Sequence, residues 1–136
     1  NTHFGFQFNA AGGSGFNETI TSTWFENTFD ESGGSSEVAY GGSYDQSQGT
    51  GVQQIGTGIG ADDDQNFNGI LHLFNPSSTT YVKHFYARAS YDWHTSGIKS
   101  PFVAGYVNTT TAIDEITFKF ASGNIDNAVI QMFGIA

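Results

Sequence analysis

Apolar and polar residues alternate with a period of two along much of this chain, which predicts β-strands. Phe occupies every second position from residue 4 to residue 8, and Ile or Phe does so from residue 116 to residue 120. Side chains of a strand point to opposite faces in turn, so this pattern indicates one buried and one solvated face. We expect these two segments to contribute to the hydrophobic core.

Similar patterns or strand-forming residues recur between turn signals. The segment 18–29 fits a helical face as well as a strand, and we favour a strand because Thr, Trp and Phe prefer pleated surfaces. Asn75-Pro76-Ser77-Ser78 is a turn signal between two such runs and predicts a hairpin. The last expected strand is Ala128–Ile135. About eight to nine short strands and no helix predict an all-β, antiparallel β-sandwich, jelly-roll-like, over the single domain 1–136.

Composition agrees with an all-β domain. The 136 residues include 18 Gly and 21 aromatic residues, and only 12% of them are charged, against about 25% in ordinary domains. The chain has 13 acidic and four basic residues, for a formal charge of −9, and no Cys. This balance argues against nucleic-acid and anionic-membrane partners. Because the chain starts at Asn1, without Met, in a strand pattern, we expect a mature or partial chain with preceding sequence missing.

An acidic run is the sharpest cluster of possible ligands. Asp62, Asp63 and Asp64 lie in a Gly-rich stretch, and Ca²⁺ prefers six to eight oxygen ligands. The run lacks the spacing of an EF-hand loop, and a solvated acidic turn is the favoured interpretation. We therefore expect no cofactor, with Ca²⁺ at these residues as the alternative.

Two histidines flank the predicted hairpin turn almost symmetrically. His72 and His84 are placed to face each other across the ladder. Zinc would need a third ligand, so a structural role is favoured. The glycine-rich stretch Gly56–Gly60 has no following helix pattern and no nearby Lys, and it is interpreted as a bulged turn rather than a phosphate-binding loop.

Five aromatic side chains fall in or beside expected loops. Such rings stack on sugars in lectin-like β-sandwiches, and they also cap cores or pack in subunit interfaces. The candidate contact residues for a partner or glycan are Tyr40, Tyr44, Tyr91, Trp93 and His94.

Catalytic signatures are weak in this sequence. Paired carboxylates for glycoside hydrolysis are available by number alone, and their spacing singles out no pair. No Gly-x-Ser-x-Gly elbow supports a serine nucleophile. We expect a protein that is not an enzyme and carries no catalytic residues.

Two segments carry a family resemblance. Residues 69–85 contain Leu-His-Leu-Phe-Asn-Pro-Ser-Ser-Thr-Thr-Tyr, and residues 105–135 contain Thr-Ala-Ile, Ile-Thr-Phe-Lys-Phe, Ser-Gly-Asn-Ile and Phe-Gly-Ile. Together they resemble a family of bacteriophage virion structural proteins from marine and freshwater phages. Phe133 stands where that family usually has Tyr. The resemblance covers residues 67–135 well and residues 3–60 only by character. Members of the family usually begin with one or two further strands, so the resemblance implies that N-terminal strands of a longer protein precede this chain.

The resemblance implies a non-enzymatic, surface-exposed virion module, in capsid decoration or in a tail fibre or appendage. The implied partners are the chain itself, as a homotrimer that covers leftover hydrophobic surface of one sheet, and other virion proteins. The alternative is a carbohydrate-binding, receptor-recognition module for a host surface glycan, and a glycan-degrading enzyme ranks below both.

Overall fold

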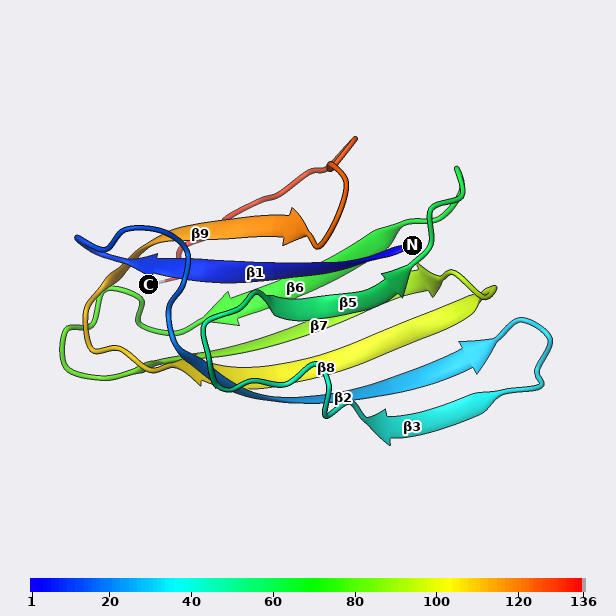
Figure 1. The fold of residues 1–136 in the computed structure, drawn as a ribbon, viewed down its shortest axis with the longest axis horizontal. Helices are drawn as coiled ribbons and strands as arrows, with labels where there is room; N and C mark the ends of the chain where they lie inside the picture. Colours follow the sequence, from blue (N-terminus) through cyan, green and yellow to red (C-terminus); the bar gives the residue numbers. More distant parts are fainter. Residues whose placement is uncertain (136) are drawn as a thin grey trace.

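Nine strands make up the regular structure of residues 1–135, the residues that the computed structural model describes (Figure 1). All their pairings are antiparallel, and no helix occurs within these residues. The all-β, antiparallel prediction is confirmed, including the choice of a strand at 18–29. The strands are β1 (Thr2–Ala10), β2 (Ile20–Asp30), β3 (Ser36–Tyr40), β4 (Ser47–Gly49), β5 (Gln53–Ile59), β6 (Phe67–Leu73), β7 (Lys83–Trp93), β8 (Gly97–Val107) and β9 (Ile113–Phe120).

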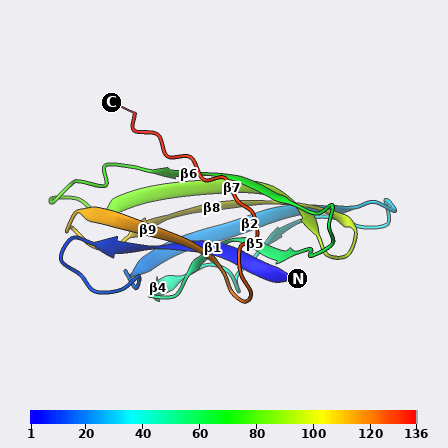
Figure 2. The same cartoon turned by 90° about the horizontal axis from the view of Figure 1, so that it is seen from above.

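The strands join in the order β3-β2-β8-β7-β5-β1-β9, with β4 added to β2 and β6 to β7. A single residue pair, Ile59 with Trp93, joins β5 to β7, whereas β7 pairs along most of its length with β6 and β8. We call this pair the seam. The sheet folds back on itself at the seam, so that β9 and β1 lie across from β6 and β7 (Figure 2). This packing is β-sandwich-like, and the jelly-roll connectivity stays a prediction.

Aromatic side chains fill the space between the two parts of the sheet. Phe6 and Phe8 on β1 are fully buried, as the alternation predicts, but Gln7 on the opposite face is fully buried as well, so the prediction of a solvated face for this strand is wrong. Phe6 meets Phe85 of β7 edge to face, with ring centroids 5.2 Å apart and planes at 88°. Phe4 is only half-buried and packs at the margin of this core. The other buried members of the cluster are Ala10, Ile20, Trp24, Ile55, Ala87, Val103, Val107 and Ile113.

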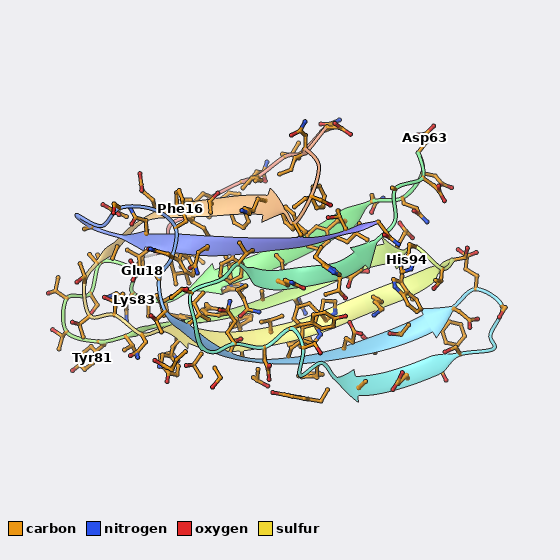
Figure 3. All side chains as sticks on the ribbon, in the orientation of Figure 1. Phe16, Glu18, Asp63, Tyr81, Lys83 and His94 are labelled. Atoms are coloured by element: carbon orange, nitrogen blue, oxygen red, sulfur yellow. The ribbon has the colours of Figure 1, made fainter. Side chains whose placement is uncertain are left out.

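A lysine is buried on the inner face of β7. Lys83 has no exposed surface, and its Nζ donates to the carbonyl oxygens of Thr109 at 3.1 Å and Thr111 at 2.6 Å (Figure 3 labels Lys83 and Glu18). Desolvation lowers the pKa of Lys83, and the negative charge of Glu18 opposes that effect. The two hydrogen bonds fasten the β8–β9 connection to the sheet.

The structure corrects two sequence predictions. The Gly56–Gly60 stretch is not a turn: most of it lies in β5, where Gly58 adopts a φ of +61° and the pairing with β1 shifts register. Ala128–Ile135 is not a strand, because within residues 1–135 it has no strand beside it. The segment leaves the body of the molecule instead (Figure 2).

Candidate functional site

The outer side of the larger part of the sheet carries a broad set of exposed apolar side chains, which we call the aromatic face. Its members alternate with buried residues along β2, β7 and β8, and the pairing register places those on β3 and β6 on the same side. Phe25 remains 48% exposed and Phe102 40% exposed. The aromatic face consists of Phe25, Phe29, Val38, Tyr40, Ile70, Tyr86, Ile98 and Phe102.

Strand register aligns five of the side chains on this side into one row. Phe25 pairs with Tyr40 on β3 and with Phe102 on β8, Phe102 pairs with Arg88 on β7, and Arg88 pairs with Ile70 on β6. The rings of Phe25 and Phe102 are stacked, with centroids 5.4 Å apart and planes at 7°. The row therefore presents three aromatic rings and one isoleucine side chain beside one guanidinium group. Of the five loop aromatics predicted as contacts, Tyr40 alone belongs to it.

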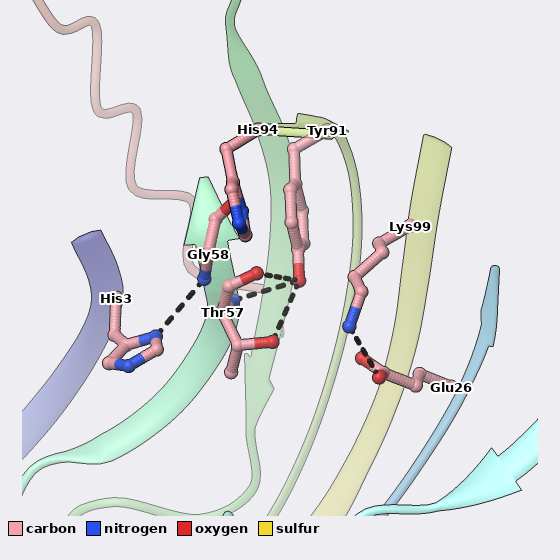
Figure 4. A network of polar contacts seen from close by, with 7 residues as sticks. All are labelled: His3, Glu26, Thr57, Gly58, Tyr91, His94 and Lys99. Atoms are coloured by element: carbon pink, nitrogen blue, oxygen red, sulfur yellow. Dashed lines mark hydrogen bonds and ion pairs between the residues drawn. The ribbon is translucent and has the colours of Figure 1, made fainter. Parts of the chain in front are cut away.

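The other four predicted aromatics gather near the seam, on the opposite side of the sheet. Backbone groups of Gly58 join His3 and His94 there: the Gly58 N–H donates to His3 Nδ1 at 3.1 Å, and His94 Nδ1 lies 3.0 Å from the Gly58 oxygen (Figure 4). A carbonyl only accepts, so His94 carries its hydrogen on Nδ1, whereas His3 leaves Nδ1 free to accept. Trp93 packs edge-on against His94, and Tyr44 packs against His3.

Tyr91 is a core residue, which corrects its prediction as a contact residue. It is 2% exposed, because the alternation of β7 points it inward. Its hydroxyl accepts from the Thr57 N–H at 2.8 Å and donates to the Thr57 carbonyl oxygen at 3.1 Å (Figure 4). Burial raises the pKa of Tyr91 to about 12. Its role is to bind β7 to β5 beside the seam.

A buried ion pair lies beneath the half-buried Trp93. Lys99 Nζ is 2.7 Å from Glu26 Oε1 and 4.6 Å from the centroid of the Trp93 ring system. Both charged side chains are about nine-tenths buried. Glu26 Oε2 has no hydrogen-bond partner among the described residues. No sequence pattern singles out this pair, since the two residues are far apart along the chain and only the β2–β8 pairing brings them together.

Trp93 also lines an open concavity of about 570 Å³ at the end of the sheet. Asp30 shares it, and the hydroxyl of Ser32 donates to Asp30 Oδ1 at 2.7 Å. This bond, with smaller contributions from backbone N–H groups, lowers the pKa of Asp30 and favours its carboxylate form. An aromatic ring beside a carboxylate suits contact with a polyhydroxylated ligand. The other lining residues are Glu31, Ser32, Ser35, Thr95 and Ser96.

The acidic run lies on the β5–β6 loop, which begins directly after the seam residue Ile59 (Figure 3 labels Asp63 at its tip). Asp62, Asp63 and Asp64 are all exposed. The N–H of Asp62 donates to Gln65 Oε1 at 3.1 Å, and its carbonyl accepts from the Gln65 N–H at 3.0 Å. Over residues 1–135, no three His, Asp or Glu side chains gather as a metal site would need.

The two histidines of the β6–β7 hairpin do not face each other, contrary to prediction. His72 pairs with Tyr86, and their rings stack with centroids 4.5 Å apart. His84 lies nearer the turn, where its carbonyl oxygen accepts from the Phe74 N–H. The observed β6–β7 register differs by two positions from the register that would place His72 opposite His84. A shift of two leaves both histidines on the same face of the sheet, as predicted, but separates them along it.

No family model, curated protein or solved structure was found to match this chain. Within the described residues, the structure contains no helix with the length and hydropathy needed to cross a membrane.

Proposed function

We propose that this chain is a non-enzymatic structural module of a bacteriophage virion, which docks onto neighbouring protein subunits through the aromatic face. The observation that carries the proposal is the continuous row of Tyr40, Phe25, Phe102, Arg88 and Ile70 across five strands. Soluble monomers rarely leave large contiguous apolar patches exposed, and such patches mark interaction sites. The virion assignment rests on the family resemblance of residues 67–135.

The chemistry of the aromatic face suits a protein partner. Aromatic residues and Arg are enriched at the centres of protein interfaces, whereas Lys, Glu and Asp are depleted there. Arg88 is the one charged residue of the row, and it lies between Ile70 and Phe102. Rigid side chains held on a paired sheet lose little conformational entropy on binding. This position on a sheet also agrees with the expectation that leftover hydrophobic surface is covered in the assembly.

The test replaces the centre of the aromatic face and follows assembly. We expect the double variant Phe25→Ser/Phe102→Ser to lose incorporation into particles, because a central aromatic side chain contributes about 2 kcal/mol or more to binding. Tyr81→Ser is the matched control, since Tyr81 is an exposed aromatic residue outside the aromatic face. Thermal unfolding shows whether each variant folds. Normal incorporation of the folded double variant would contradict docking through this face.

The Trp93 concavity favours a second candidate, a carbohydrate-binding receptor module. Trp93 offers a half-buried ring, and Asp30 offers an ionised acceptor for sugar hydroxyl groups. Glycan-array binding by the purified chain that is lost in Trp93→Ala, but kept in the Phe25→Ser/Phe102→Ser variant, would support this candidate. Absence of binding to any glycan on the array would count against it.

A further inference from the structure

One strand edge and one extended segment have no β-ladder partner within the described residues. Within residues 1–135, β9 pairs only with β1, so the other edge of β9 is open. The segment 125–135 has strand-forming residues and no ladder partner among the same residues. Open strand edges are templates for pairing with a further strand.

The open edge of β9 offers both hydrogen-bonding groups and apolar surface. The Ala121 N–H donates to the His3 carbonyl at 2.8 Å, which fixes the phase of the β1–β9 ladder. Along an antiparallel strand, the N–H and C=O groups of successive residues point alternately to one neighbouring strand and to the other. Ala121 points these groups toward β1, so Phe120 and Phe118 point theirs away from β1, toward the open edge. The side chains of Ile116, Phe118 and Phe120 contact the core but remain partly exposed.

The segment 125–135 matches such an edge. It has no charged residue after Asp126, and Val129 is 83% exposed and Phe133 77% exposed. No backbone hydrogen bond ties residues 123–135 to the rest of the described chain. Apolar residues occupy both of its faces, as in strands that are covered on two sides.

We propose that residues 125–135 of one copy add as a strand to the β9 edge of a second copy. A second copy is favoured over the same chain because the segment crosses the open side of the sheet and projects beyond β6, instead of returning along β9 (Figure 2). Donor and acceptor are different surfaces, so the contact is head to tail and closes as a ring of copies or as a reciprocal exchange. The added strand covers Phe118 and Phe120 while burying its own apolar residues. This inference does not rest on the aromatic face.

Cysteine cross-linking tests the pairing directly, because the chain has no native Cys. Thr117→Cys places a thiol on β9, and Gln131→Cys places one on the segment. The two single variants of the 136-residue chain, one with an affinity tag, are mixed, equilibrated and treated with a short bismaleimide. We expect a tagged–untagged dimer in severalfold excess over a control mixture in which Ser36→Cys, at the exposed end of β3, replaces Thr117→Cys.

Two cross-linking results would overturn the proposal. One is a link within single chains of the double variant Thr117→Cys/Gln131→Cys with no excess of mixed dimer, which means that the segment closes its own edge. The other is equal cross-linking in the test and control mixtures. Sedimentation velocity gives an independent measure: Ile130→Asp is expected to dissociate the oligomer to the 14.6 kDa chain, whereas Phe25→Ser/Phe102→Ser is expected to leave this contact intact. A wild-type chain that stays monomeric at all concentrations would contradict the strand donation. This result would leave the proposed docking through the aromatic face standing.

Discussion

Phe25 on β2 and Phe102 on β8 stack almost parallel on the solvent side of the sheet, with their ring centroids 5.4 Å apart. Their neighbours on the same strands, Trp24 and Val103, are buried in the core. At this position both faces of the two strands are therefore apolar, although only one is covered. A stack that stays in solvent preorganises a flat surface, and the proposed docking uses that surface.

The Phe25–Phe102 stack predicts a measurable coupling in the isolated chain. Replacement of each residue by Leu keeps an apolar side chain and removes one ring. A double-mutant cycle on the free energy of unfolding is expected to give a coupling of about 0.5–1.5 kcal/mol, the range of aromatic pairs. Additive effects in urea titrations would show that the two rings do not stabilise each other.

Tyr91 predicts a loss of stability in alkali. An unfolded tyrosine ionises near pH 10.0, whereas folded Tyr91 keeps its proton to about 12. Between these values the unfolded state binds fewer protons, so the free energy of unfolding falls by up to about 1.4 kcal/mol for each pH unit. Urea titrations at stepped pH measure this slope.

The matched variant for the alkaline slope is Tyr91→Phe. It leaves the Thr57 N–H without its acceptor, so we expect a stability lower by about 1–3 kcal/mol at neutral pH. Its stability is also expected to fall less steeply above pH 10.0 than that of the parent. Because Lys83 is common to both chains, its contribution cancels in the comparison. Equal slopes in the two chains would contradict the assignment to Tyr91.

The Glu26–Lys99 pair predicts a large penalty for removing one charge. Glu26→Gln leaves the buried ammonium group of Lys99 without its counter-charge, which costs about 3–5 kcal/mol. Glu37→Gln is the control: Glu37 is exposed, and surface substitutions usually change stability by about 0.5 kcal/mol or less. Chemical denaturation measures both variants, and similar midpoints for the two would show that the ion pair is not needed for stability.

The backbone conformation at Gly58, beside Trp93 and His94, predicts that a larger residue at this position is strained. Its φ of +61° suits glycine, and an added Cβ would lie 2.9 Å from His94 Nδ1 and 2.9 Å from Trp93 Nε1. We expect Gly58→Ala to lower the free energy of unfolding by about 1–3 kcal/mol. Gly51→Ala should change it little, since that position has open space and no positive φ. Thermal melts followed by tryptophan fluorescence compare the two, and equal melting temperatures would refute the strain.

Strand positions were predictable from the sequence because the alternation is local. The inward face of β7, with Phe85, Ala87 and Ala89, follows from counting by two, and the structure buries these residues. The same count places Tyr91 on this face, against its prediction as a contact residue. Ala128–Ile135 has the composition of a strand, but a strand forms only beside a partner. Composition carries no information on whether that partner belongs to the same chain.

The candidate site was harder to predict, because long-range register determines it. Tyr40, Tyr44, Tyr91 and Trp93 were grouped by their closeness to loops, yet the structure separates Tyr40 from the others by placing them on opposite sides of the sheet. The apolar pairs Trp24-Phe25 and Phe102-Val103 were the available signal for a two-sided strand. The pairing of β2 with β8 depends on contacts far apart in sequence, which periodicity does not reveal.

Cryo-electron microscopy of the assembled particle tests the proposed function most directly. The account predicts density for this chain at a repeated position on the capsid or tail, with Phe25, Phe102 and Arg88 buried against a neighbouring subunit. A particle that contains this chain with the aromatic face in solvent would contradict docking through that face. A particle without the chain would contradict the virion assignment itself.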